Sequence, residues 1–168
     1  MANTYTLISS VTVGSGGASS ITFSNIPQTY TDLCLVTSLR SNNSGATWAG
    51  LIFNGSATNF TSRNVLGTGS AVNSQTVTDY IYVSLMNSSA DTANTFSSTS
   101  IYIPNYTSSN YKSWSSDTVR ENNTTSAEQF MWGFLYSNTN AITSIQLYLG
   151  ANNFVQYSTA YLYGIKNS

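Results

Sequence analysis

The chain has 168 residues and a net charge of −1, and charged side chains make up only 7% of it, against about 25% in an ordinary soluble domain. This length fits one domain with a substantial core. The absence of histidine excludes Ser-His-Asp and Cys-His catalytic arrangements and removes the commonest metal ligand. No apolar run is long enough for a transmembrane helix, and the five basic residues form no patch for nucleic acid: Arg40, Arg63, Lys112, Arg120 and Lys166.

Alternation of apolar and polar residues with a period of two predicts short strands along the whole chain. The first two strands are expected over residues 4–13 and 21–23, joined as a hairpin by a glycine-rich turn at 14–17 and closed by Pro27. The next strand, 33–41, is the most continuous apolar run and is expected to lie at the centre of a sheet. Further strands are expected over residues 48–53, 60–66, 78–85, 96–103, 111–120, 129–136, 142–149 and 157–166.

The segments between these strands carry turn signals. Asn54-Gly55 predicts a tight turn from which the strand at 60–66 returns. Residues 70–75 are expected to be loose, 87–94 to form a loop or one short helical turn, and 121–125 to form a turn. In the strand at 111–120, alternate residues are predicted on opposite faces: Tyr111, Ser113 and Ser115 on one, Lys112 and Trp114 on the other.

About ten or eleven short strands at regular spacing indicate a sandwich or barrel rather than alternating strands and helices. Twelve tyrosines, seven phenylalanines and three tryptophans favour pleated, half-buried surfaces. We therefore predict one all-β domain over residues 1–168, a jelly-roll-like antiparallel β-sandwich. Ser, Thr and Asn make up about four residues in ten, so the surface is expected to be polar but uncharged, which suits close packing among many copies.

No residue set predicts catalysis, a cofactor or a metal site. Cys34 is the single cysteine, and its apolar surroundings predict a small buried core residue. Asp117 and Glu121, with Arg120 beside them, are interpreted as a solvated turn with a local ion pair rather than a pair of catalytic carboxylates. The acids also lack the spacing of a calcium-binding loop.

The aromatic residues leave three possibilities open. Tyrosine and tryptophan combine an apolar ring with a polar tip, so core and subunit interface are the default interpretations and stacking on sugars is the alternative. The residues in question are Tyr102, Tyr106, Tyr111, Trp114, Tyr136, Tyr148, Tyr161 and Tyr163.

Several stretches together resemble a family of small virion structural proteins from marine and aquatic tailed bacteriophages, and the resemblance spans nearly the whole chain. They are the opening Tyr5-Thr6-Leu7-Ile8 with Val13-Gly14-Ser15-Gly16-Gly17-Ala18, the stretch from Phe23 to Leu33, Phe53-Asn54-Gly55-Ser56, Ile101-Tyr102-Ile103-Pro104-Asn105-Tyr106, and the ending from Gln156 to Lys166. The family carries no known catalytic residues to transfer.

The resemblance implies a virion component: a capsid decoration (cement) protein, or alternatively a tail or head fibre module that recognises host-surface carbohydrate. Decoration is favoured because the sequence holds no heptad stalk or repeat of the kind fibres use. The implied partners are the major capsid protein or other virion proteins and further copies of the chain, with a trimer expected by analogy. Residues 1–5 lack the features of a signal peptide, so we expect assembly in the host bacterial cytoplasm.

Overall fold

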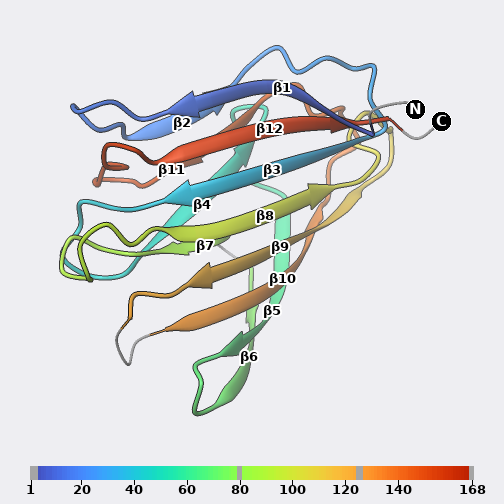
Figure 1. The fold of residues 1–168 in the computed structure, drawn as a ribbon. Coiled ribbons are helices and arrows are strands. Elements are labelled where there is room, and N and C mark those ends of the chain that lie inside the picture. Colours follow the sequence, from blue (N-terminus) through green and yellow to red (C-terminus); the bar gives the residue numbers. More distant parts are fainter. Residues whose placement is uncertain (1–3, 79–80, 124–126, 167–168) are drawn as a thin grey trace.

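The computed structural model describes residues 4–78, 81–123 and 127–166, and all the paired strands in these ranges are antiparallel (Figure 1). No helix occurs in these ranges. The strands are β1 (Tyr5–Thr12), β2 (Ser20–Phe23), β3 (Asp32–Leu39), β4 (Thr47–Phe53), β5 (Phe60–Gly67), β6 (Val72–Val77), β7 (Tyr82–Met86), β8 (Ser97–Ile103), β9 (Lys112–Arg120), β10 (Glu128–Tyr136), β11 (Ile145–Tyr148) and β12 (Thr159–Ile165).

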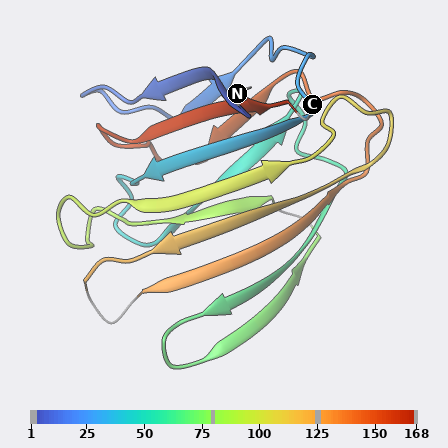
Figure 2. The same ribbon diagram turned by 45° about the vertical axis from the view of Figure 1, so that its right-hand side comes forward.

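The strands form two layers. One sheet has eight strands in the order β1-β12-β3-β8-β9-β10-β5-β6, and the other has four in the order β2-β11-β4-β7. The larger sheet extends past the smaller one, and the β5–β6 hairpin lies at its free end (Figure 2). The predicted antiparallel β-sandwich is therefore confirmed, with twelve strands in the described part instead of ten or eleven. The finer jelly-roll description stays a prediction.

The predicted hairpin between the first two strands is wrong. β1 pairs with β12, and β2 pairs with β11, so the two strands lie in different sheets. The glycine-rich turn carries the chain from one layer to the other, where the Ala18 amide bonds the Phe154 carbonyl at 3.0 Å. Period-two alternation identifies a strand and its buried face, but it does not identify the partner strand, and the nearest one was assumed.

The Asn54-Gly55 turn is confirmed, because both residues have positive φ (53° and 75°) and the Ser56 amide donates to the Phe53 carbonyl at 3.0 Å. The strand that follows does not return along β4, however. β5 pairs with β10 and β6 in the opposite sheet. The segment expected to be loose contains most of β6, which is exposed on both faces and therefore shows no alternation.

The core lies between the sheets and is lined by inward-facing residues from strands of both sheets. β3 lies between β12 and β8, as its apolar run predicted. The alternation predicted for β9 is confirmed, since Lys112 and Trp114 are buried and Ser113 and Ser115 exposed. The Trp114 ring stacks on Phe134 with centroids 3.9 Å apart, in a layer of aromatic residues that fixes the spacing of the sheets.

Gly164 on β12 marks a close approach of a ring to the backbone. A Cβ placed at this position would lie 2.3 Å from Cγ of Tyr30, whose ring covers the strand. We therefore expect Gly164→Ala to lower the free energy of unfolding by about 1–3 kcal/mol, because the ring has to move or the strand has to shift. Urea denaturation measures this loss. Gly133→Ala is the matched control, since nothing lies within 4 Å of a Cβ there, and an equal loss in both variants would contradict the explanation.

Candidate interaction surface

The charged ammonium group of Lys112, at the start of β9, is buried and forms hydrogen bonds within the chain. Its side chain is 2% exposed, and Nζ donates hydrogen bonds of 2.7–3.2 Å to four backbone carbonyls, those of Ser108, Asn110, Asn138 and Asn140. Burial lowers the pKa of this ammonium group, but the carbonyl oxygens replace its water shell. The cation thus joins the loop that precedes β9 to the loop that follows β10. Because it is buried, it does not face a ligand in solvent.

Arg120, at the end of β9, lies in a second internal cluster. Its guanidinium donates to both carboxylate oxygens of Asp91 at 3.0 Å and to Glu128 Oε2 at 2.7 Å. The predicted local ion pair with Asp117 and Glu121 is therefore wrong: Arg120 is 6% exposed and bonds residues from other segments. The alternation of β9 explains this, because Arg120 faces inward and Asp117 outward.

Asp91 is held ionised by its surroundings. Burial alone would raise the pKa of its carboxyl group, but hydrogen bonds from the Ser88 amide, Arg120 and Asn122, together with the positive charge of Arg120, lower that pKa to about 2. The backbone carbonyl of the same residue accepts a bond from the buried guanidinium of Arg40 at 3.0 Å. Two arginines therefore fix the loop between β7 and β8.

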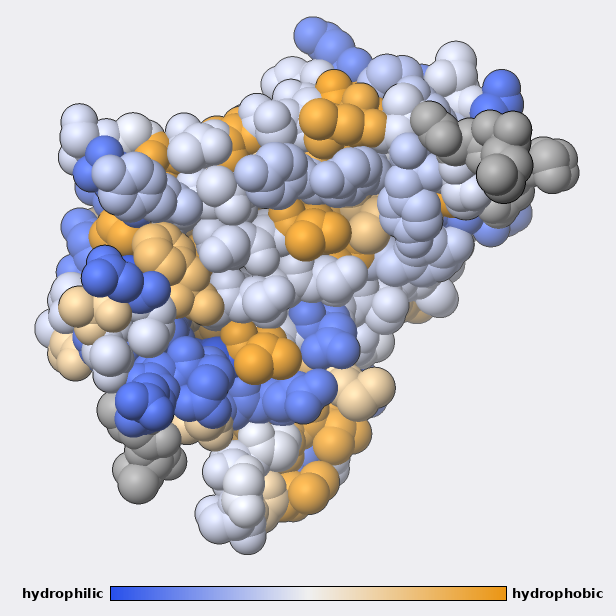
Figure 3. Space-filling model, in the orientation of Figure 1, coloured by the Kyte–Doolittle hydropathy of each residue, from blue (hydrophilic) through white to orange (hydrophobic). Residues whose placement is uncertain are grey.

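Few charges are left for the surface. Among the described residues, four charged side chains are exposed: Arg63, Asp117, Glu121 and Lys166. Three of the five basic residues are buried, and the remaining two lie on β5 and after β12. In Figure 3 the outer face of the large sheet is largely pale, with small separate hydrophobic areas and a hydrophilic region in its lower half.

A group of tyrosines covers one half of this face. Tyr5 on β1 and Tyr163 on β12 meet edge to face, with ring centroids 6.3 Å apart. Beside them Tyr102 on β8 is 40% exposed, and its hydroxyl donates to Asp32 at 2.7 Å. That hydrogen bond, with burial and the negative charge of Asp32, raises the pKa of Tyr102 to about 12. The Tyr102 phenol therefore stays neutral, and the three rings together present mixed apolar and hydroxyl surface.

Cys34 lies on the outer side of β3, opposite Tyr163 in the neighbouring strand, and not in the central core. It is buried (7% exposed), as predicted, because the outer-face side chains cover it. This burial raises the pKa of its thiol, so the thiolate needed for nucleophilic chemistry is disfavoured.

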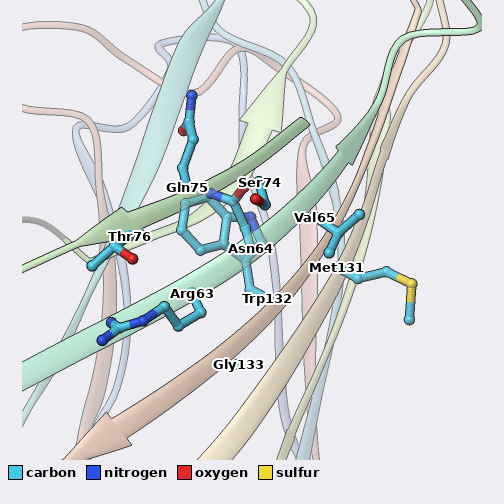
Figure 4. A pocket seen from close by; sticks show the side chains of 9 residues that line it. All are labelled: Arg63, Asn64, Val65, Ser74, Gln75, Thr76, Met131, Trp132 and Gly133. Carbon is cyan, nitrogen blue, oxygen red and sulfur yellow. The ribbon is translucent and has the colours of Figure 1, made fainter. Parts of the chain in front are cut away.

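The other half of the outer face contains a hollow at Gly133 on β10. Glycine has no side chain to fill this position between Arg63 on β5 and Ser115 on β9. Cavities of about 560 and 470 Å³ lie on either side of it, the first between β10, β5 and β6. Figure 4 shows the first with Val65 and Met131 at one end and Arg63 at the other. These cavities are shallow, and their exposed lining is mostly aliphatic and hydroxyl with one guanidinium.

Sequence reasoning missed Tyr157, which precedes β12. This residue is 68% exposed and has a left-handed backbone (φ 71°), which is rare for a bulky side chain. It borders a cavity of about 410 Å³ whose lining includes Asn42, Asn94 and Gln156. Within the described ranges the other left-handed non-glycine residues are all asparagines, which tolerate this conformation, so no sequence signal marks the tyrosine.

The structure separates the tyrosines and tryptophan whose positions the sequence left open. Tyr106, Trp114 and Tyr136 belong to the core, and the Tyr106 hydroxyl donates to the Pro27 carbonyl. Tyr102 and Tyr111 are exposed. Tyr148, Tyr161 and Tyr163 are half-buried on the two sheets.

The described residues contain no group of three or more His, Cys, Asp and Glu side chains that could hold a metal ion. They also contain no helix of the length and apolarity needed to cross a membrane. Comparison of the chain with protein-family models, with curated proteins and with solved structures found no match.

Proposed function

We propose that this chain is a non-enzymatic bacteriophage capsid decoration protein, which binds the outer shell in many copies. The main support for the proposal is the location of the chain's ionisable side chains. Lys112, Arg120 and Arg40 bond loops of their own chain, and the broad outer face is left nearly uncharged. A catalytic site needs the opposite arrangement, with perturbed ionisable groups facing a cleft.

The nearly uncharged face supports attachment to a crowded lattice. Copies of a weakly charged domain can sit side by side without long-range repulsion. Each contact of Ser, Thr and Tyr side chains contributes little, but attachment to several capsid subunits at once makes binding strong. The resemblance to tailed-phage virion proteins points to the same setting, with the major capsid protein as the partner.

Cryo-electron microscopy of purified virions that carry this chain tests the location. We expect repeated density of a 168-residue β-sandwich on the outer shell of the head. Density confined to the tail, or absence of the chain from particles, would sink the proposal.

Salt provides a second test. Because the outer face has few charges, we expect binding to the shell to change by less than about threefold between low salt and 1 M NaCl. Sedimentation of particles after incubation at each concentration measures the bound fraction. Release of the protein at moderate NaCl concentration would mean that ion pairs hold it, contrary to this expectation.

A second candidate function, recognition of host-surface carbohydrate by a fibre module, is favoured by Tyr157. An exposed ring held in a strained backbone beside the amides of Asn42, Asn94 and Gln156 has the chemistry of a sugar platform. A glycan array distinguishes the two functions. Binding that is lost in Tyr157→Ala and kept in Tyr111→Ala would support the fibre module, and no binding at high micromolar concentration would count against it.

A further inference from the structure

The strand β6 forms an open edge of the eight-stranded sheet. It pairs with β5 on one side, and its residues are exposed along almost its whole length (Figure 2). Its sequence, Val-Asn-Ser-Gln-Thr-Val, contains no charge and no proline. Natural proteins protect such edges with charges, prolines, bulges or short length, because unpaired N–H and C=O groups are a template for another strand.

The other edges of the sandwich carry these protections. β1, at the opposite end of the large sheet, has an irregularity in its pairing between Leu7 and Ser9. β2 has only four residues, and β7 packs against β8 and β9. Among the described strands, β6 therefore combines exposure, length and regular pairing in a way that the other edge strands do not.

The hydrogen-bond pattern identifies which groups of β6 are free to pair. At the tip of the hairpin the Thr68 amide donates to the Ala71 carbonyl at 3.0 Å, so this is a hydrogen-bonded pair. In an antiparallel ladder such pairs alternate, which directs the backbone groups of residues 73, 75 and 77 toward β5. The amides and carbonyls of Val72, Ser74 and Thr76 consequently point away from the sheet.

We propose that β6 is a two-fold pairing edge, at which two copies of this chain join their large sheets into one, in place of the trimer expected by analogy. A two-fold axis through Ser74 places Ser74 opposite Ser74 of the second copy and Val72 opposite Thr76. All three outward-pointing residues then bond, giving about six N–H···O bonds. On the inner face the same register places Asn73 opposite Gln75, two amides that hydrogen-bond each other.

The second copy is favoured over a foreign strand because the edge complements itself. β6 holds no charge that would repel its own image, and this pairing places the Cα atoms of the two Arg63 residues roughly 20 Å apart, beyond the screening length in physiological salt. Val65 (49% exposed) and Met131 (63%) lie in one row with Ser74, so each copy adds apolar surface beside the axis. Figure 3 shows hydrophobic atoms at this lower end of the molecule.

Engineered cysteines test both the contact and its register. Ser74→Cys would face its own copy across a hydrogen-bonded pair, about 5.5 Å between Cα atoms, which a disulfide spans. Thr76→Cys on the same face is the matched control, because its copy would lie about 13 Å away along the strands. After mild oxidation we expect a covalent dimer from Ser74→Cys and not from Thr76→Cys. Cys34 is buried and present in both variants.

Sedimentation equilibrium of the full chain at tens of micromolar supplies an independent measurement. We expect a mass twice the 18.1 kDa of the chain, and the mass of a single chain for Ser74→Pro, in which the lost N–H is one that points outward. A monomeric or trimeric unchanged chain, a Ser74→Pro variant of unchanged mass, or equal cross-linking of both cysteine variants would overturn the proposal. None of these outcomes depends on whether the protein decorates a capsid.

Discussion

Lys112→Met is expected to lower the free energy of unfolding by about 3 kcal/mol. Methionine fills a similar volume but donates no hydrogen bond, so the carbonyls of Ser108, Asn110, Asn138 and Asn140 lose the cation that they share. These partly buried acceptors lose a charged donor, and the two loops lose their common anchor. Equilibrium unfolding in guanidinium chloride, followed by tryptophan fluorescence, measures the change.

Lys166→Met is the control for loss of a positive charge, because Lys166 is exposed and follows the last strand. Its effect should stay within about 0.5 kcal/mol. If the two variants were equally stable, the four-carbonyl site would contribute nothing, and the loops would have to be held by their remaining contacts.

Arg120→Met is expected to cost about 3–5 kcal/mol, because it leaves the carboxylates of Asp91 and Glu128 without their shared cation in a largely buried place. Urea unfolding at pH 7 measures the loss. Arg63→Met removes an exposed arginine from β5, in the same sheet, and serves as the control. Equal losses in the two variants would contradict the assigned role of Arg120.

The same cluster predicts how stability responds to acid. The pKa of Asp91 is about 2 in the folded chain and lies near its ordinary value of 3.8 in the unfolded chain. Its contribution is thus complete above the unfolded pKa and is lost as the pH falls from about 4 toward 2. Asp91→Asn should flatten the fall in unfolding free energy across this window. An unchanged slope would show that other carboxyl groups cause the acid sensitivity.

The sequence predicted the strands well where one face is buried. β9 is an example, because its strict alternation of inward Lys112 and Trp114 with outward serines can be seen in the residues themselves. β6 could not be predicted this way, since both of its faces meet water and no pattern results. The partner of each strand could not be predicted either. β1 pairs with a strand about 150 residues later, and the alternation of a strand does not indicate which other strand it pairs with.

The chemical character of the surface was predicted, but the contacts of individual side chains were not. Composition alone indicated a nearly uncharged, hydroxyl-rich exterior and the absence of histidine chemistry. The partners of Arg120 were missed because the nearest acids in the sequence, Asp117 and Glu121, were taken as its neighbours in space. The backbone strain at Tyr157 and the free edge of β6 arise from the tertiary arrangement. Neither can be predicted from residue types or from their spacing in the sequence.

The pairing of the first strands with the last ones determines when this protein can fold. A ribosome delivers β1 and β2 more than 100 residues before their partners β12 and β11. The β1–β12 and β2–β11 pairs cannot form on a growing chain until β11 and β12 have been synthesised. Because these partners are far apart in the sequence, we expect the two sheets to be completed more slowly than in a fold built from local hairpins.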